Sequence, residues 1–192
     1  MIPHHLMMHN PANLLPGRRI SVIGSTGSGK TTMARLLAER LDLPRVELDA
    51  LHWGPNWTEE PDDLFRERTD LALRGDAWVV DGNYAVVRDI VWSRADTVVW
   101  LDYDLPLIMW RLTRRLFRRA VLKEEIWHGN TESLRIHFMT KDSLYVWALQ
   151  TYRPRRRQYP ALLALPEHSH LKTIHLRSPR EARRWLTSVG KD

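Results

Sequence analysis

Residues 20–32, ISVIGSTGSGKTT, place apolar and β-branched residues directly before a glycine-rich turn, a lysine and two threonines. Residues 24–31 fit the pattern G-x-x-x-x-G-K-[ST] in full, between a predicted strand (18–25) and a predicted helix (29–41). Glycines let backbone N–H groups turn toward phosphate oxygens, and the start of the helix adds a partial positive charge. The stretch therefore predicts a loop that binds the polyphosphate of a nucleotide.

The expected cofactors are ATP and Mg²⁺. In loops of this pattern the lysine, here Lys30, reaches the β- and γ-phosphates, and the hydroxyl of the next residue, Thr31, coordinates magnesium. An Asn-Lys-x-Asp element, which guanine specificity normally needs, is absent from the sequence, so adenine is favoured. The candidate cofactor contacts are Gly24, Ser25, Thr26, Gly27, Ser28, Gly29, Lys30, Thr31 and Thr32.

Strand patterns alternate with helical patterns along the rest of the chain. This alternation predicts a parallel sheet with helices on both faces. The further strands are expected at 45–51, 77–84, 96–103 and 171–176, and the further helices at 57–73, 105–120, 132–151, a shorter stretch to 165, and 178–190. A short helical piece is expected between the third and fourth strands.

Three aspartates follow predicted strands, where the carboxyl ends of a parallel sheet open into a ligand crevice. Asp49 can orient an attacking hydroxyl or accept its proton, although it can also cap the segment that follows. Asp81 suits magnesium, because Gly82 lets the backbone pass close to the phosphates. Asp102 competes with Asp81 for the metal, but its Asp-Tyr-Asp-Leu-Pro turn is more typical of a helix start.

Composition narrows the possible partners and compartment. The 192 residues carry 29 Lys and Arg against 23 Asp and Glu, a net charge of +6, and no cysteine. The excess of positive charge favours an anionic partner, and the absence of cysteine excludes disulfides and thiolate chemistry and suits the cytoplasm. Residues 1–17 fit a flexible leader, with neither signal peptide nor membrane anchor, before a single domain at 18–192.

With these residues assembled, the chain resembles the adenylate-kinase-like group of P-loop kinases. The resemblance is carried by GSTGSGKT, LDALHWGPNW, VVDGNY, ADTVVWLD, an arginine-rich helix and GNTESLR. It is closest to a bacterial subgroup known as adenylate kinase-related or DNA topology modulation (FlaR-related) proteins. The resemblance implies an α/β P-loop NTPase sandwich with a five-stranded parallel sheet in the order 2-3-1-4-5. It also implies an acceptor-binding segment near 52–75 and a helical lid near 118–132.

The resemblance also implies that arginines surround the transferred phosphoryl group, and Arg111 and Arg115, one helical turn apart, are the candidates. Two departures from adenylate kinases concern the acceptor. Their third strand continues Asp-Gly-Phe-Pro-Arg, whereas here Asn83-Tyr84 follow, and Arg88 is the nearest arginine. Their second strand also lacks an aspartate like Asp49, which kinases resembling shikimate or gluconate kinase carry.

These features predict a P-loop kinase that transfers the γ-phosphoryl group of ATP to a small acceptor, with a metabolite hydroxyl favoured over a nucleoside monophosphate. Lys30, Asp49, Arg111 and Arg115 are the candidate catalytic residues, and Thr31 and Asp81 the candidate metal ligands. The acceptor would contact Asp49, His52, Trp53, Gly82 and Arg88, although both tryptophans of the 52–57 segment can equally pack in the core. A nucleotide-switched DNA-binding protein and a simple ATPase are the alternative functions, and nucleic acid and membrane are not expected partners.

Overall fold

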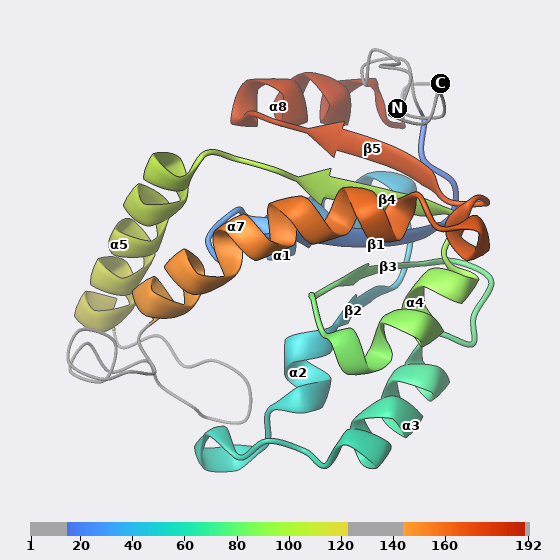
Figure 1. The fold of residues 1–192 in the computed structure, drawn as a ribbon, viewed down its shortest axis with the longest axis horizontal. Coiled ribbons are helices and arrows are strands. Elements are labelled where there is room, and N and C mark those ends of the chain that lie inside the picture. Colours follow the sequence, from blue (N-terminus) through green and yellow to red (C-terminus); the bar gives the residue numbers. More distant parts are fainter. Residues whose placement is uncertain (1–14, 123–143, 191–192) are drawn as a thin grey trace.

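The computed structural model describes residues 15–122 and 144–190. Five parallel strands form one sheet: β1 (Arg19–Gly24), β2 (Arg45–Glu47), β3 (Trp78–Asp81), β4 (Thr97–Leu101) and β5 (Lys172–Leu176). Their spatial order is β2-β3-β1-β4-β5, which confirms the predicted topology (Figure 1). β1 lies in the centre and its last residue, Gly24, is paired with Leu101 at the end of β4.

Helices connect the strands and cover both faces of the sheet. In chain order they are α1 (Lys30–Leu41), α2 (Leu48–His52), α3 (Asp62–Ala72), α4 (Arg88–Arg94), α5 (Leu105–Leu122), α7 (Leu144–Leu163) and α8 (Pro179–Ser188), with short 3₁₀ turns at Pro55–Trp57, Ala85–Val87 and Pro166–His168. Of the helices in the described ranges, none has both the length and the apolar character that crossing a bilayer requires.

The sheet separates two apolar cores. On one face, α1 and α8 pack on alternate strand residues, with Leu37 and Trp185 fully buried. On the other face, α3, α4 and the end of α7 bury Phe65, Trp92 and Tyr159. The helix α5 stands beyond the carboxyl ends of the strands, where α7 crosses it (Figure 1). This arrangement leaves the carboxyl edge of the sheet as the place where loops and helix ends meet.

Two predictions about local structure are wrong. The second strand ends at Glu47, so Asp49 lies in the first turn of the short helix α2 rather than at the end of a strand. The predicted break before Pro154 is absent, because α7 continues through both Pro154 and Pro160. A proline inside a helix costs about 3 kcal/mol, and tertiary packing of α7 on the sheet offsets that cost.

The predicted lid at 118–132 and the start of the predicted helix at 132–151 lie largely outside the described residues, as does most of the leader at 1–17. The acceptor segment at 52–75 is described in full. It consists of the end of α2, a 3₁₀ turn and α3, joined by an isolated bridge between Trp53 and Glu59.

Candidate active site

The glycine-rich loop has the backbone that its sequence pattern requires. Gly27 and Gly29 adopt φ values of 83° and 95°, a region that glycine enters without strain. A Cβ atom at Gly27 would also lie 2.8 Å from Leu112 of α5, so α5 packs directly on the loop. Gly29 is the residue before α1, and the loop N–H groups therefore gather at the positive end of a twelve-residue helix. This is the geometry of an anion site.

Thr31 and Asp81 meet beneath the loop, although fifty positions separate them in the sequence. The Thr31 hydroxyl donates to Asp81 Oδ2 at 2.7 Å. The other oxygen, Asp81 Oδ1, is buried without a hydrogen-bond partner among the described residues. A hydroxyl and a carboxylate oxygen side by side are hard oxygen donors of the type that Mg²⁺ prefers, directly or through its water shell. The pair therefore fits the expected metal, whereas Asp102 lies elsewhere in the site.

Burial raises the pKa of Asp81 from 3.8 to about 6, and the Thr31 hydrogen bond and the charge of Lys30 oppose that shift. A raised carboxyl pKa means that ionisation destabilises the folded protein as the pH rises from about 4 toward 6. Asp81→Asn keeps an acceptor for Thr31 and removes the charge. We expect it to raise the free energy of unfolding of the nucleotide-free protein by roughly 1 to 3 kcal/mol at about pH 7.5, and by under about 1 kcal/mol near pH 4.

Urea denaturation at both pH values measures this effect. Asp76→Asn is the matched control, because Asp76 is an exposed loop aspartate for which the same change should leave the unfolding free energy unaltered. A lower stability of Asp81→Asn at neutral pH would contradict the assignment of Asp81 as a carboxylate that needs a bound cation.

Lys30 lies among charged groups from four parts of the chain. Its ammonium donates to the carbonyl of Ser25 at 3.3 Å, inside the loop. Loss of hydration lowers the pKa of Lys30 from 10.5 to about 8, and nearby Arg155 and Arg115 lower it further. Asp49 and Asp81 act in the opposite direction. Asp49 of α2 and Asp81 of the metal pair thus both act on the same lysine.

Asp49 is held by a phenol that the sequence analysis missed. The Tyr84 hydroxyl donates to Asp49 Oδ1 at 2.7 Å. Burial and the charge of Asp49 raise the pKa of Tyr84, so the phenol remains a donor. Tyr84 is in turn packed against His52, with ring centroids 4.6 Å apart, and against Phe65 at 5.1 Å. Three elements, α2, α3 and the chain after β3, therefore fix one carboxylate oxygen.

This packing changes the interpretation of the aromatic residues after Asp49. His52 is buried and contacts the rings of Trp53, Phe65 and Tyr84. Trp53 lies edge-on to Trp57 at 5.8 Å and its side chain bonds to the Tyr84 hydroxyl. Neither His52 nor Trp53 lines the pocket described below. Their position supports a role in holding Tyr84 rather than a wall that the acceptor touches.

Asn83 extends the ladder between β1 and β3 by means of its side chain. The last backbone pair of the register is Val22 with Asp81, and the same register continued by two residues sets Gly24 opposite Asn83. The Asn83 amide oxygen accepts from Gly24 N at 3.2 Å, and its amide nitrogen donates to Gly24 O. The start of the phosphate loop is therefore supported while the backbone after β3 turns away toward Tyr84.

Arg111 of α5 contacts the loop itself. Its Nη1 donates to the carbonyl of Ser28 at 2.7 Å, and its guanidinium lies over the Tyr103 ring. Arg115, one turn further along α5, is close enough to influence the pKa of Lys30. Arg111 is therefore the arginine of α5 that contacts the loop backbone directly.

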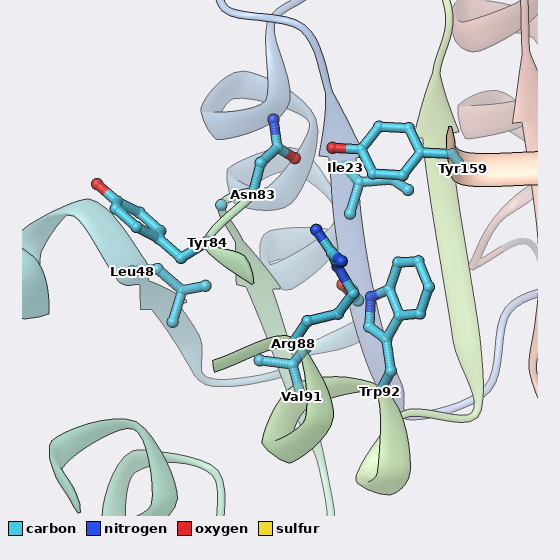
Figure 2. A pocket seen from close by; sticks show the side chains of 10 residues that line it. Ile23, Leu48, Asn83, Tyr84, Arg88, Val91, Trp92 and Tyr159 are labelled. Atoms are coloured by element: carbon cyan, nitrogen blue, oxygen red, sulfur yellow. The ribbon is translucent and has the colours of Figure 1, made fainter. Parts of the chain in front are cut away.

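A small hollow opens next to the loop between α2, α4 and α7 (Figure 2). Arg88 points into it from α4, with its guanidinium over the Trp92 ring at 5.6 Å. Among the described residues, no carboxylate or hydrogen-bond acceptor pairs with this guanidinium. The lining residues are Ser21, Ile23, Leu48, Gly82, Asn83, Tyr84, Arg88, Val91, Trp92 and Tyr159. The hollow thus combines an apolar and aromatic wall with one uncompensated cation.

The structure therefore brings most of the predicted residues together. Asp81 bonds to Thr31 and Arg111 bonds to Ser28, so both lie against the loop. Asp49 lies near Lys30, and Gly82 and Arg88 line the hollow. Sequence reasoning missed Asn83, Tyr84, Tyr159 and Arg155. The spacing of VVDGNY could have pointed to Asn83 and Tyr84, because they follow a strand that ends at the site. Arg155 belongs to the arginine cluster at 153–157, and no local pattern marks Tyr159.

Comparisons with known proteins agree with this geometry. No family model matches the chain. The chain is 31% identical over 123 residues to a shikimate kinase of Gloeobacter violaceus, which covers 57% of this chain and 70% of that protein. It is 31% identical over 125 residues to a shikimate kinase of Thermosynechococcus vestitus, with 58% and 68% covered.

Solved structures with a similar fold include a shikimate kinase from Acinetobacter baumannii in complex with shikimate, at a TM-score of 0.52 and 20% identity, covering 88% of this chain and 89% of that one. A gluconokinase from Sinorhizobium meliloti has a TM-score of 0.50 and 20% identity, with 90% and 91% covered. The fold, the phosphate loop and these similarities define a P-loop kinase, an enzyme that transfers a phosphoryl group from a nucleotide to a small molecule. Within that class, the chain belongs to the shikimate kinase family. The narrower resemblance to the FlaR-related subgroup is not among these similarities.

Proposed function

We propose that this kinase transfers the γ-phosphoryl group of Mg·ATP to a hydroxyl of a small acceptor that also carries an anionic group. The observation that carries the proposal is the position of Asp49, which Tyr84 orients and which faces the same lysine as the Thr31–Asp81 pair. A carboxylate at that position favours a hydroxyl over a phosphate as the attacking group, because it would repel a second phosphate dianion.

The residues have separate roles in the transfer. Asp49 accepts the proton of the acceptor hydroxyl, and the hydroxyl oxygen of the acceptor forms a bond to the γ-phosphorus. The bond between that phosphorus and the β,γ-bridging oxygen breaks, and ADP is the leaving group. Lys30 and the loop N–H groups stabilise the negative charge on the phosphate oxygens. Arg111 holds the loop in shape through Ser28. Thr31 and Asp81 would hold magnesium, which neutralises charge on the β- and γ-phosphates when bound.

The hollow supports the anionic character of the acceptor. The Arg88 guanidinium has no counter-charge in the described part of the chain and lies against aromatic rings, so a carboxylate or phosphate of the acceptor would supply the missing partner. A hydroxylated carboxylic acid, the chemical type of shikimate and gluconate, offers a carboxylate to Arg88 and a hydroxyl to Asp49. A nucleoside monophosphate offers an anionic group to Arg88 but would receive its phosphoryl group on a phosphate, and is therefore the second candidate.

A screen of ATP consumption tests this function. Purified protein with Mg·ATP is offered shikimate, gluconate, further hydroxylated carboxylates, neutral sugars and the nucleoside monophosphates, and ADP formation is measured. We expect turnover with at least one hydroxylated anion and none with neutral sugars. AMP-dependent turnover would show that the protein is a nucleoside monophosphate kinase. Hydrolysis without acceptor would indicate an ATPase, and ATP-dependent DNA binding without any turnover would indicate the nucleotide-switched protein.

Arg88→Met tests the anion contact within the same assay. The change keeps much of the length of the side chain and removes its charge, so we expect the KM for the anionic acceptor to rise about 10-fold to 100-fold while the KM for ATP changes little, since a charged hydrogen bond contributes roughly 1.5 to 3 kcal/mol. Arg94→Met is the matched control on the same helix, because Arg94 is paired with Asp70 on the far side of α4. An unchanged acceptor KM in Arg88→Met would refute the contact.

A further inference from the structure

Two buried hydroxyls line the hollow and have no partner of their own. Ser21 and Tyr159 are each only 2% exposed, and both side chains belong to the lining. Within residues 15–122 and 144–190, no hydrogen bond of either hydroxyl is seen. Leaving a buried hydroxyl unbonded is costly, and nearly all buried polar groups of folded proteins have a partner. The two hydroxyls therefore indicate that the hollow receives a polar group of a ligand.

The central strand places Ser21 in the hollow. Ser21 is paired with Val80 of β3 and with Val98 of β4, so it lies in the middle of the sheet. Side chains alternate between the two faces of a strand, and Ile23, two residues further on, lines the same hollow. Central strands of a parallel sheet are buried on both faces and are normally apolar throughout. A serine at this position is thus explained better by a polar ligand than by packing.

Tyr159 enters the hollow from α7, and its hydroxyl points inward (Figure 2). Its ring lies edge-on to Trp100 of β4, with centroids 5.7 Å apart, and Trp100 is in turn stacked on His175 at 4.0 Å. Nearly one turn earlier in α7, Arg156 Nε donates to the buried carboxylate of Asp102 at 2.7 Å. These contacts hold the Tyr159 hydroxyl in place before a ligand arrives, which reduces the entropy that binding costs.

The polar groups of the hollow are suited to an anion. Burial raises the pKa of Tyr159, although the charges of Arg155 and Arg88 oppose the shift, so the phenol keeps its proton at neutral pH. Arg88 is permanently charged, and its guanidinium lies over the Trp92 ring. No carboxylate belongs to the lining of the hollow. The hollow thus offers one cation and two hydroxyl donors to whatever enters it.

The same groups favour a carboxylate over a phosphate. Arg88 is the only cation of the lining, so it neutralises a carboxylate, whereas a phosphate dianion would keep an unpaired charge against apolar walls. The guanidinium fork also matches the two oxygens of a carboxylate. Tyr84 connects the hollow to the proposed base, because its ring lines the hollow while its hydroxyl bonds to Asp49. A molecule with its carboxylate in the hollow can therefore present a hydroxyl to Asp49.

We propose that Tyr159 and Ser21 are specificity-determining residues, which together with Arg88 bind the anionic group of the acceptor and restrict it to a carboxylate. Each hydroxyl donates to a carboxylate oxygen whose charge Arg88 neutralises. That the carboxylate belongs to the phosphoryl acceptor rests on the proposed function, whereas its binding in the hollow does not.

Carboxylate binding can be measured without turnover. The chain has five tyrosines, so ring signals of ¹³C-labelled tyrosine can be followed by NMR, with Tyr159→Phe identifying the signal of Tyr159. Tyr103 reports on the phosphate loop, because Arg111 lies over its ring and donates to the loop. The probes are shikimate, gluconate and glycolate, the neutral amides of these acids, and inorganic phosphate. We expect at least one carboxylate to shift the Tyr159 signal to saturation, its amide to bind about 10-fold more weakly or worse, and phosphate to shift the Tyr103 signal instead.

Variants then assign the contacts. Tyr159→Phe keeps the ring against Trp100 and removes only the hydroxyl, and its binding is followed by the signal of Tyr84. We expect Tyr159→Phe and Ser21→Ala each to weaken carboxylate binding about 10-fold or more, and to lower the preference for acid over amide by about 5-fold to 10-fold. Tyr145→Phe is the matched control, because that hydroxyl lies on the same helix but bonds to Thr113 of α5.

Three results would overturn the proposal. The first is that no carboxylate shifts the Tyr159 signal, and the second is that inorganic phosphate shifts it more strongly than any carboxylate. The third is an equal loss of acid and amide binding in Tyr159→Phe, which would show that the hydroxyl has only a structural role. Carboxylate binding without any ATP turnover would refute the proposed function and leave the pocket standing. Turnover of a phosphorylated sugar without carboxylate binding would do the opposite.

Discussion

Replacing Lys30 with methionine is expected to reduce the rate of phosphoryl transfer by about 1,000-fold or more. A preorganised hydrogen-bond donor at the transferred phosphate raises the rate by about two to three powers of ten, and a positively charged donor raises it further. The amine lies within the loop and donates to the carbonyl of Ser25. Its surroundings lower its pKa, which means that the folded protein holds the charged amine at a cost. The variant should therefore fold at least as stably as the wild-type protein.

Stopped-time assays of ADP formation and calorimetric titration with Mg·ATP measure the two effects. Lys172→Met is the matched control, because Lys172 lies exposed at the start of β5, at the opposite end of the sheet. If Lys30→Met retains most of its turnover, the phosphate loop does not take part in the phosphoryl transfer, whatever the affinity of the variant for nucleotide.

Replacing Asp49 with asparagine is expected to lower kcat by about 100-fold to 10,000-fold, the usual contribution of a general base. Asparagine keeps the oxygen that accepts from Tyr84, so α2 and the aromatic cluster around Tyr84 should remain folded. The affinity for Mg·ATP should stay close to that of the wild-type protein, since the nucleotide is bound by the loop and by the Thr31–Asp81 pair.

Single-turnover measurements with the acceptor from the screen separate this loss from slow product release. Asp63→Asn is the matched control, because Asp63 is exposed in the first turn of α3, within the same acceptor segment. AMP-dependent ADP formation that survives Asp49→Asn would show that no base is needed and that a phosphate, not a hydroxyl, is the attacking group.

The parallel α/β class and the phosphate loop could be predicted because their signals are local, whereas the strand order was an implication of the family resemblance, which the structure confirms. The alternation of strands and helices limits the possible topologies of the sheet. The spacing of the glycines, Lys30 and Thr31 identifies the phosphate loop. The preference for Asp81 over Asp102 as the magnesium residue rests on the turns after the two strands, because the Asp-Gly turn is more constrained than the Asp-Tyr-Asp-Leu-Pro turn. The structure places Asp102 in the Arg156 and His175 cluster instead.

The rest of the site depends on contacts that no short pattern encodes. Tyr84 reaches Asp49 across 35 positions, and Arg156 reaches Asp102 across 54. The continuity of α7 through Pro154 has the same origin, since packing on the sheet outweighs a local penalty. His52 was predicted to contact the acceptor, and in the structure its ring packs against Phe65 and Tyr84, a contact that the sequence does not reveal.

The separation between loop and hollow has an evolutionary consequence. The groups proposed to hold phosphate and metal lie at the end of β1, in α1 and in β3, whereas Arg88, Trp92 and Tyr159 lie on the helices α4 and α7. Asn83 ties the loop to β3 by its own side chain, independently of what fills the hollow. Descendants of such a protein can therefore exchange one acceptor for another by altering three helical side chains, while the machinery for handling ATP is inherited intact.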